Sequence, residues 1–216
     1  MGSSLPLNEF LTAREVGAQL DVSRETLERL ERYVDLLLKW QRVINLIGPS
    51  TADDIWRRHI LDCGQLTAHL SGSGGPVIDI GSGAGFPGLV LAILGAPDVY
   101  LVEANSRKCA FLREVIRATG TDATVLNERV EEVRGLNAGV VTARAVASLD
   151  RLLELSKFLY TPDTLFIFPK GKEFKNELTE LKNKWSMALT VLPSLSNAEG
   201  VILKLESLVR VDAAYD

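Results

Sequence analysis

The stretch that decides the fold runs from Val77 to Gly88 and reads VIDIGSGAGFPG. A short apolar run that contains one carboxylate, Asp79, leads directly into a turn with glycines at positions 81, 83, 85 and 88. The apolar run predicts a buried strand, and the glycines let the backbone turn tightly and approach a ligand with no Cβ in the way. Pro87 favours the first turn of a helix. The stretch therefore predicts a strand, a ligand-binding turn and a helix in succession.

Strands and helices alternate after this stretch. Short β-branched runs predict strands at Val77–Ile80, Val99–Glu103, Ala123–Leu126, Val140–Ala145 and Thr164–Pro169. Helical periodicity predicts helices at Gly88–Leu94, Arg107–Thr119, Leu149–Tyr160 and Glu173–Trp185. Two last runs, Ala188–Leu192 and Val201–Glu206, are joined by a loop too short for a crossover helix, which favours an antiparallel hairpin. The pattern predicts an α/β fold with a mostly parallel sheet, helices on both faces and a C-terminal antiparallel hairpin.

The residues before the stretch are predicted to be helical. Apolar positions recur at helical spacing from Glu25 to Leu46, and a second helix is expected from a capping box at Thr51 and Asp54 to about Leu70. The following Ser71–Gly75, SGSGG, has the composition of a flexible joint. We therefore divide the chain into an N-terminal helical extension, residues 1–74, and a ligand-binding domain, residues 75–216.

Composition narrows the classes of protein further. The 216 residues are 46% hydrophobic and 24% charged, as in a globular protein, and no apolar run approaches the roughly 18 to 20 residues that a membrane span needs. No secretory signal is visible, and Cys63 and Cys109 lack the spacing of a metal site or a disulfide framework. We expect a cytoplasmic protein without a metal. The net charge of −4 argues against a general nucleic-acid binder, so any such contact must come from local patches.

Two acidic residues distinguish between the cofactors that use a glycine turn. A dinucleotide fingerprint fits poorly, because the third glycine comes one place early and Phe86 occupies its position. Asp79 would repel a pyrophosphate but complements a cation, and S-adenosylmethionine has an ammonium group, a sulfonium centre and no phosphate. Glu103 ends the second strand, where it can accept from both ribose hydroxyls. Together they favour a methyltransferase over a dehydrogenase, with a turn cap at Asp79 and a surface position for Glu103 as the structural alternatives.

Further site residues are expected at the ends of later strands. The loop after the third strand places Val130 on an adenine ring and Glu131 or Arg129 at its polar edge, with an exposed helix start as the alternative. Arg144 and Lys170 each follow a strand at the carboxyl edge of the sheet, where ligands bind in open α/β folds. A charge at such a position is costly unless it emerges into a site or finds a partner.

Five segments carry a family resemblance, in order and in spacing: KWQRVINLI at 39–47, RRHILDC at 57–63, DIGSGAGFPG at 79–88, ARAVASLD at 143–150 and FPKGK at 168–172. They resemble the glucose-inhibited division protein B family, the bacterial small-subunit ribosomal RNA guanine-N7 methyltransferases, over nearly the whole chain. Ile47 stands where that family usually has threonine, and Cys63 where it often has serine. Both departures lie outside the glycine turn and bear on the acceptor rather than on the methyl donor.

The resemblance implies a class I, Rossmann-like methyltransferase fold in residues 75–216. It implies S-adenosylmethionine as cofactor and a guanine of 16S ribosomal RNA as methyl acceptor. The implied cofactor contacts are Gly81, Phe86, Val130, Glu131 and Arg144, beside Asp79, Gly83 and Glu103 from the residue chemistry.

The acceptor chemistry agrees with this implication. Guanine N7 holds a lone pair at neutral pH, so the enzyme needs positioning rather than a general base. We assign the catalytic positions to Arg144 and Lys170, and acceptor binding to Asn45, Arg58, His59, Pro87, Lys170 and Lys172. A structural hydrogen bond of His59 and a helix-surface ion pair of Arg58 with Asp62 remain the alternatives.

The acidic net charge bears on the partner. Because phosphate contacts supply most non-specific affinity for RNA, we expect a small-subunit ribosomal particle, which offers shape as well as charge, and no membrane partner. Two other functions remain open: methylation of a small molecule or a protein, and a non-catalytic ribosome-binding module.

Overall fold

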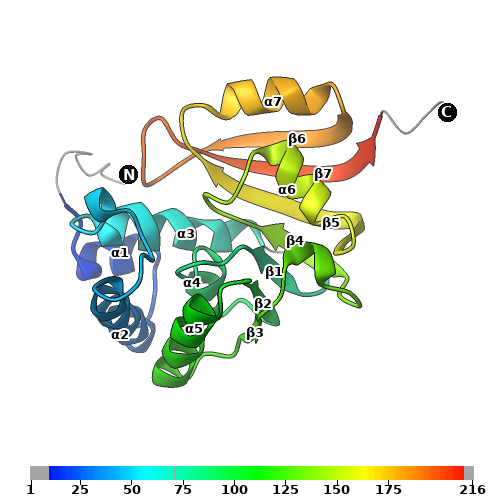
Figure 1. Cartoon of the computed structure of the whole chain (residues 1–216). Coiled ribbons are helices and arrows are strands. Elements are labelled where there is room, and N and C mark those ends of the chain that lie inside the picture. Colours follow the sequence, from blue (N-terminus) through cyan, green and yellow to red (C-terminus); the bar gives the residue numbers. More distant parts are fainter. Residues whose placement is uncertain (1–9, 71, 212–216) are drawn as a thin grey trace.

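The computed structural model describes residues 10–70 and 72–211, which build a seven-stranded sheet with the strand order β3-β2-β1-β4-β5-β7-β6 (Figure 1). The strands are β1 Val77–Ile80, β2 Val99–Val102, β3 Thr124–Leu126, β4 Ala138–Thr142, β5 Tyr160–Lys170, β6 Trp185–Pro193 and β7 Val201–Arg210. Strands β1 to β5 pair in parallel, and β7 pairs antiparallel with both β5 and β6. The predicted α/β fold with a C-terminal antiparallel hairpin is confirmed.

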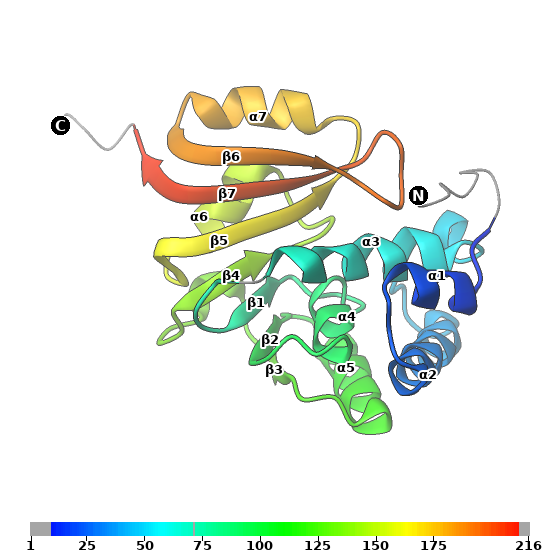
Figure 2. The ribbon, with the colours of Figure 1, turned by 180° about the vertical axis from the view of Figure 1, so that it is seen from behind.

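Helices cover both faces of the sheet. The helices α4 Gly88–Ile93 and α5 Ser106–Thr119 lie on one face, and α6 Leu149–Leu155 and α7 Phe174–Lys182 on the other (Figures 1 and 2). Alternate strand residues enter two cores, with Val77 in the first and Ile78 in the second. A parallel sheet needs this burial on both sides, which is why its strands are almost entirely apolar.

The N-terminal helices form part of the first core. They are α1 Ala13–Gln19, α2 Arg24–Gln41, the short turns η1 Pro49–Thr51 and η3 Gln65–His69, the π-helix η2 Trp56–Leu61 and α3 Asp62–Gly64. Fully buried Leu30, Tyr33 and Leu37 of α2 share that core with Phe111 and Leu112 of α5. The extension is thus packed on the sheet through α4 and α5, and the domain division after residue 74 stays a prediction.

The helix ends in the extension differ from the prediction. The helix α2 ends at Gln41 rather than Leu46, because the Gln41 side chain accepts from the backbone N–H of Leu46 at 2.8 Å and donates to the carbonyl of Ile47 at 2.9 Å. The capping box predicted at Thr51 is wrong, since the Thr51 hydroxyl donates to the Gly48 carbonyl at 2.7 Å. A capping box forms instead at Thr12 and Glu15, where it starts the unpredicted helix α1.

Three boundaries further along the chain also differ. The helices predicted to reach Tyr160 and Trp185 end earlier, because these two aromatic residues begin β5 and β6. Ser71 of the predicted joint lies outside the described residues. Gly74 packs so closely on β4 that a Cβ added at Gly139 would lie 2.1 Å from the Gly74 carbonyl oxygen. The flexible joint stays a prediction.

The helices of the described residues are too short or too polar to cross a lipid bilayer. None of those in residues 10–70 and 72–211 combines the length and the apolar character that a transmembrane helix needs.

The fully buried Tyr33 gives a test of how the extension supports the sheet. Its hydroxyl donates to the carbonyl of Ala84 in the glycine turn. Tyr33→Phe removes this donor and leaves a buried carbonyl without it, so we expect the free energy of unfolding in urea to fall by about 1–3 kcal/mol. Tyr160→Phe, at the half-buried start of β5, is the matched control and should change it far less. Equal effects of the two substitutions would contradict this role of the Tyr33 hydroxyl.

Candidate active site

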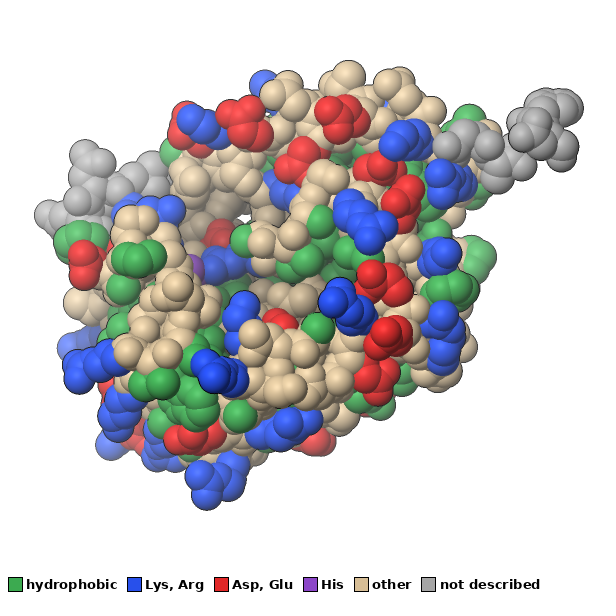
Figure 3. All heavy atoms as spheres, in the orientation of Figure 1, with side chains coloured by type: hydrophobic (Ala, Val, Ile, Leu, Met, Phe, Trp, Pro, Cys, Tyr) green, Lys and Arg blue, Asp and Glu red, His purple; other side chains and the backbone are tan. Residues whose placement is uncertain are grey.

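A cleft of about 990 Å³ opens at the carboxyl ends of β1, β4 and β5. It lies between the N-terminal helices and the β6–β7 hairpin, and basic side chains gather along the hollowed face (Figure 3). Neighbouring strands β1 and β4 are not consecutive in the chain, so their helices leave to opposite faces and open a crevice between them. This switch point is where ligands bind in open α/β sheets.

The three glycines of the turn have different roles. Gly81, Gly83 and Gly85 have φ angles of 69°, 56° and 93°, which L side chains rarely adopt. A Cβ at Gly81 would lie 2.7 Å from the Val146 side chain, and one at Gly85 would lie 2.8 Å from Leu89, so both positions are closely packed. A Cβ at Gly83 would meet nothing nearer than the Gly81 carbonyl at 3.7 Å. Gly83 therefore faces the open cleft and forms a cradle that a side chain would fill.

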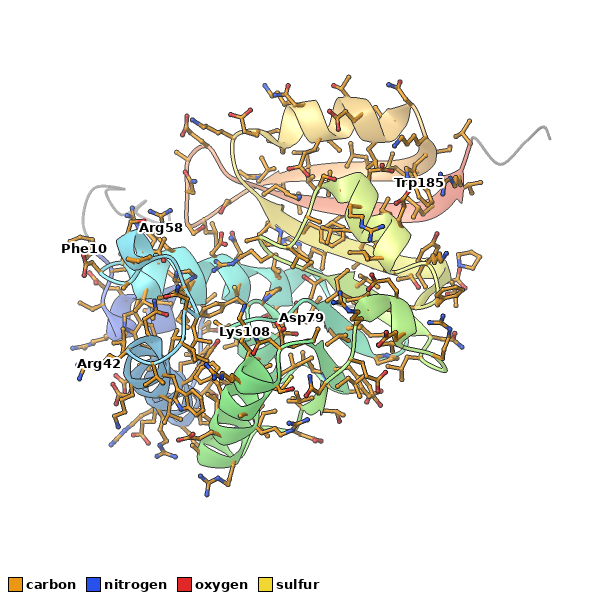
Figure 4. The ribbon with its side chains drawn as sticks, in the orientation of Figure 1. Phe10, Arg42, Arg58, Asp79, Lys108 and Trp185 are labelled. Carbon is orange, nitrogen blue, oxygen red and sulfur yellow. The ribbon has the colours of Figure 1, made fainter. Side chains whose placement is uncertain are left out.

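Asp79 lies buried beneath the turn, in the centre of the molecule (Figure 4). Its Oδ2 accepts from the backbone N–H of Gly88 at 3.1 Å, which fixes the start of α4 on β1. Its Oδ1 has no hydrogen-bond partner among the described residues, and burial raises the pKa of this carboxyl to about 7. The carboxylate thus supports the turn from below and keeps one oxygen for a further donor.

Glu103 follows β2 and holds the turn from the side. Its Oε2 accepts from the Gly83 N–H at 2.9 Å, and its Oε1 accepts from the Asn105 N–H at 2.7 Å. Each carboxylate oxygen has a second lone pair, so both can also accept from hydroxyl groups of a bound ligand. The side chain is therefore placed beside Gly83, as the ribose interpretation requires.

The Arg144 side chain points toward the N-terminal helices. Its Nη1 donates to the Arg58 carbonyl at 2.8 Å and to Asp62 Oδ2 at 3.1 Å, and its Nη2 contacts His59 Nδ1. The guanidinium also lies over the Phe86 ring, 4.9 Å from its centroid. Asp62 therefore pairs with Arg144. Arg58 contacts Arg144 only through its backbone carbonyl, and its exposed side chain lines the cleft.

His59 joins this arrangement as a neutral ring. Because Nδ1 accepts from Arg144, Nε2 carries the proton and donates to Thr51 Oγ1 at 2.9 Å. Burial, Arg144 and Arg58 together lower the pKa of His59 to about 3. The ring stacks on Phe86, with centroids 4.8 Å apart. The geometry agrees with the structural hydrogen bond that was the alternative for His59.

The remaining predicted residues occupy several places. Lys170 lines the cleft, with its Nζ 2.7 Å from Glu177 Oε2, while Lys172 is exposed beyond the lining. Asn45 is exposed in the loop after α2, and Pro87 is buried at the start of α4. Val130 begins the short turn η4 Val130–Glu132 and is buried, and the carboxylate of Glu131 lies 3.8 Å from Arg151. The cleft lining includes neither Val130 nor Glu131.

Lys108 and Glu199 are among the lining residues that the sequence did not indicate. Lys108 lies in the first turn of α5, where the Asn105 side chain accepts from its backbone N–H at 3.2 Å (Figure 4). An asparagine cap directly after the strand that ends in Glu103 could have indicated this position. Glu199 lines the cleft from the β6–β7 loop, and no local pattern indicated that this loop returns to the site.

Metal chemistry has no candidate ligand set here. In the part of the chain that the structure describes, no group of three or more His, Cys, Asp and Glu side chains is placed to hold an ion. Cys63 and Cys109 are buried and free.

A family model described as rRNA small subunit methyltransferase G, GidB, matches residues 26–202. The chain belongs to the GidB family. It is 52% identical to the ribosomal RNA small subunit methyltransferase G of Paramagnetospirillum magneticum over 189 residues, which cover 88% of this chain and 92% of the relative. The corresponding protein of Rhodospirillum rubrum is 46% identical over 93% of this chain and all of the relative. The recognised resemblance is confirmed, and this GidB-family chain is a methyltransferase whose cofactor is S-adenosylmethionine.

Solved structures agree on the fold. MtNAS, in a crystal structure of a mutant with S-adenosylmethionine, is similar with a TM-score of 0.58 at 19% identity, covering 93% of this chain and 85% of that one. The ribosomal protein L11 methylase of Lactobacillus delbrueckii subsp. bulgaricus has a TM-score of 0.55 at 15% identity, covering 68% and 77%. The Rossmann-like methyltransferase fold predicted for this GidB-family chain is confirmed.

The residues around the glycine turn fit this cofactor, with Gly83 in the cleft lining and the buried Asp79 and Glu103 directly behind it. Gly83 leaves space against the backbone of the turn, and Glu103 offers two carboxylate oxygens beside that space. The unpartnered Oδ1 of Asp79 lies below the turn and can accept from a further donor. These three features come from the GidB-family chain itself and need no rearrangement.

The contrast between Gly83 and Gly85 gives a paired test. Both have positive φ, so an alanine at either position costs backbone strain. Gly83→Ala should weaken S-adenosylmethionine binding at least about tenfold, because its Cβ enters the cradle, with only that strain as a stability cost. Gly85→Ala adds a clash with Leu89, so its loss of unfolding free energy should be larger. Calorimetry and urea unfolding measure the two effects, and unchanged cofactor affinity in folded Gly83→Ala would contradict the cradle.

The raised pKa of Asp79 predicts a pH dependence of stability. Its pKa rises from 3.8 to about 7 on folding, so the folded state favours the protonated acid. The stabilisation is full below pH 3.8 and is lost as the pH rises to about 7; at about 1.4 kcal/mol per pH unit it amounts to at most about 4 kcal/mol.

Asp79→Asn removes this titration. The difference in unfolding free energy between Asp79→Asn and the natural protein should therefore shift in favour of the variant between pH 4 and pH 7. His59, whose pKa is lowered to about 3, loses stability in the opposite direction, as the pH falls from 6.5. That contribution is present in both proteins and cancels in the difference, so a constant difference would contradict the prediction.

Proposed function

We propose that this chain transfers the methyl group of S-adenosylmethionine to N7 of a guanine in small-subunit 16S ribosomal RNA. The observation that carries the proposal is the cleft at the β1–β4 crevice of a GidB-family chain. There the open Gly83 cradle, with Glu103 behind it, shares the cleft with the cationic side chains of exposed Arg58 and half-buried Lys108.

The chemistry asks little of the side chains beyond positioning. S-adenosylmethionine supplies an electrophilic methyl group when bound, and guanine N7 already holds the attacking lone pair. The imidazole at the cleft, His59, has both nitrogens in hydrogen bonds, so it is not placed to act as a general base. Holding two reactants in line is itself worth several kcal/mol of the barrier. The rigid packing of Phe86, His59 and Arg144 provides a fixed wall for that purpose.

The proposed cofactor set keeps the residues inferred from the sequence: Asp79, Gly81, Gly83, Phe86, Glu103, Val130, Glu131 and Arg144. Asp79 acts from beneath the turn, and Arg144 acts through Phe86, whose ring it covers. Lys170 is proposed to order the acceptor side through its ion pair with Glu177, whose Oε2 also accepts from the backbone N–H of Leu149 at 2.9 Å.

Two cations of the lining are available for RNA. The side chains of Arg58 and Lys108 have no hydrogen-bond or ion-pair partner within the described residues, whereas those of Arg144 and Lys170 do. We propose that Arg58 and Lys108 bind phosphates, with Asn45, His59, Pro87 and Lys172 in supporting positions. Two free cations supply little affinity for phosphates alone, so the partner must also be recognised by its shape. We therefore propose the small-subunit ribosomal particle in the cytoplasm as the substrate.

The direct test is the location of the transferred methyl group. Protein and labelled S-adenosylmethionine are incubated with small-subunit particles and naked 16S RNA from cells that lack this gene. The label should enter N7-methylguanine at one position and prefer the particle. Label in a small molecule or a protein would support the other enzyme class, and binding without turnover would support a non-catalytic module.

Single-charge variants test the phosphate contacts. Arg58→Ala and Lys108→Ala should each weaken binding of the RNA substrate and reduce its salt slope by about one, since each removes one phosphate contact. Arg117→Ala, at the exposed far end of α5, is the matched control for charge and should leave the slope unchanged. If all three variants lower the slope alike, the binding is a diffuse charge effect rather than a contact at the cleft.

A further inference from the structure

The loop between β6 and β7, residues 194–200, lines the cleft although it lies far along the chain from the glycine turn. Both views of the ribbon show it beside the N-terminal helices (Figures 1 and 2). Gln65 Oε1 accepts from the Leu195 N–H at 2.7 Å, and Gln65 Nε2 donates to Ser194 Oγ at 3.1 Å. The exposed loop is therefore held in place by a buried side chain of η3.

Asp62 provides a second anchor and connects the loop to Arg144. Its Oδ1 accepts from Ser196 Oγ at 2.6 Å, while its Oδ2 accepts from Arg144. Ser196 is itself buried, so this end of the loop has little freedom. Asp62 thus holds both the loop and Arg144, so the loop keeps a fixed position relative to Arg144 and to the Phe86 ring that Arg144 covers.

Glu199 is the acidic residue that this loop adds to the cleft lining. Three acidic side chains line the cleft, and Asp62 and Glu177 are engaged by Arg144, Ser196 and Lys170. Within residues 10–70 and 72–211, the exposed Glu199 side chain has no hydrogen-bond or ion-pair partner. Its backbone N–H donates to the Asn197 side chain at 3.0 Å, which fixes the turn that presents it.

A free carboxylate is unfavourable in a cleft that binds RNA, because it repels phosphate. It suits a group with paired donors instead. Among the four bases, guanine presents two adjacent donors, N1–H and N2–H, on its Watson–Crick edge, and a carboxylate accepts both. N7 lies on the opposite edge of the ring, so a base held in this way leaves N7 free. Enzymes that act on bases commonly take them out of the stack and read that edge.

We infer that Glu199 is a specificity-determining residue that accepts from N1–H and N2–H of the acceptor guanine. The inference rests on the proposed function and assigns the substrate recognition of that same site. The loop of residues 194–200, which Gln65 and Asp62 hold in place, forms one side of the space for the base, and the glycine turn forms the other side.

Substitution of a single atom group in the substrate tests the inference. Inosine lacks only the 2-amino group of guanine, so small-subunit RNA is assembled with guanine or inosine at the methylated position found by mapping. The natural protein should prefer guanine over inosine about tenfold in kcat/KM, in line with the discrimination of a bidentate base contact. Glu199→Gln should methylate guanine about tenfold less efficiently and discriminate less than about threefold, with unchanged affinity for S-adenosylmethionine.

Two controls make the outcomes distinguishable. Glu206→Gln, exposed on β7 of the same hairpin, should retain the natural preference for guanine over inosine. Equal preference in the natural protein and Glu199→Gln would overturn the role of Glu199 while methyl transfer itself stands. No N7-methylguanine from the natural protein on the guanine substrate would overturn the proposed function, and this inference with it.

Discussion

The glycine turn depends on a clamp of hydrogen bonds from residues outside it, because Gly81, Gly83 and Gly85 have no side chains that could hold the backbone. Gly81, Gly83 and Gly85 all have positive φ, and fixing three glycines in one conformation costs backbone entropy. The clamp consists of Asp79 on the Gly88 N–H, Glu103 on the Gly83 N–H and Tyr33 on the Ala84 carbonyl. Since Tyr33 belongs to α2, the cofactor side of the cleft requires the helical extension as well as the sheet.

A second constraint is the pairing of charge around Arg144. A buried guanidinium must be hydrogen-bonded, and its partners come from η2 and α3, not from its own strand. His59 is neutral in this packing, because burial and the neighbouring Arg144 and Arg58 lower its pKa. Most cations near the cleft are neutralised in this way. The small number of free cations at the site follows from this pairing.

Features with a local signal were predictable from the sequence, and features that join distant segments were not. The β-branched runs gave the strands, and the glycine spacing with Glu103 gave the cofactor side. The early end of α2 required knowledge of the Gln41 side chain in contact with residues 46 and 47. The direction of Arg144 depends on Asp62 and His59, more than 80 residues earlier in the chain, so its place at the end of a strand could not show whether it enters the site or finds a partner.

The two halves of the cleft are held by different kinds of contact. The cofactor half is built mainly by short connections within β1, β2 and α4, with Tyr33 of α2 as its contact from the extension. The acceptor half is assembled from the extension and the C-terminal hairpin, joined through Asp62 and Gln65. The donor side depends on the extension through Tyr33. Within the described residues the C-terminal hairpin makes no hydrogen bond to Asp79, Glu103 or the glycine turn, so changes in the hairpin can alter the acceptor without disturbing the donor site. This separation gives a physical reason why one fold serves many methyl acceptors.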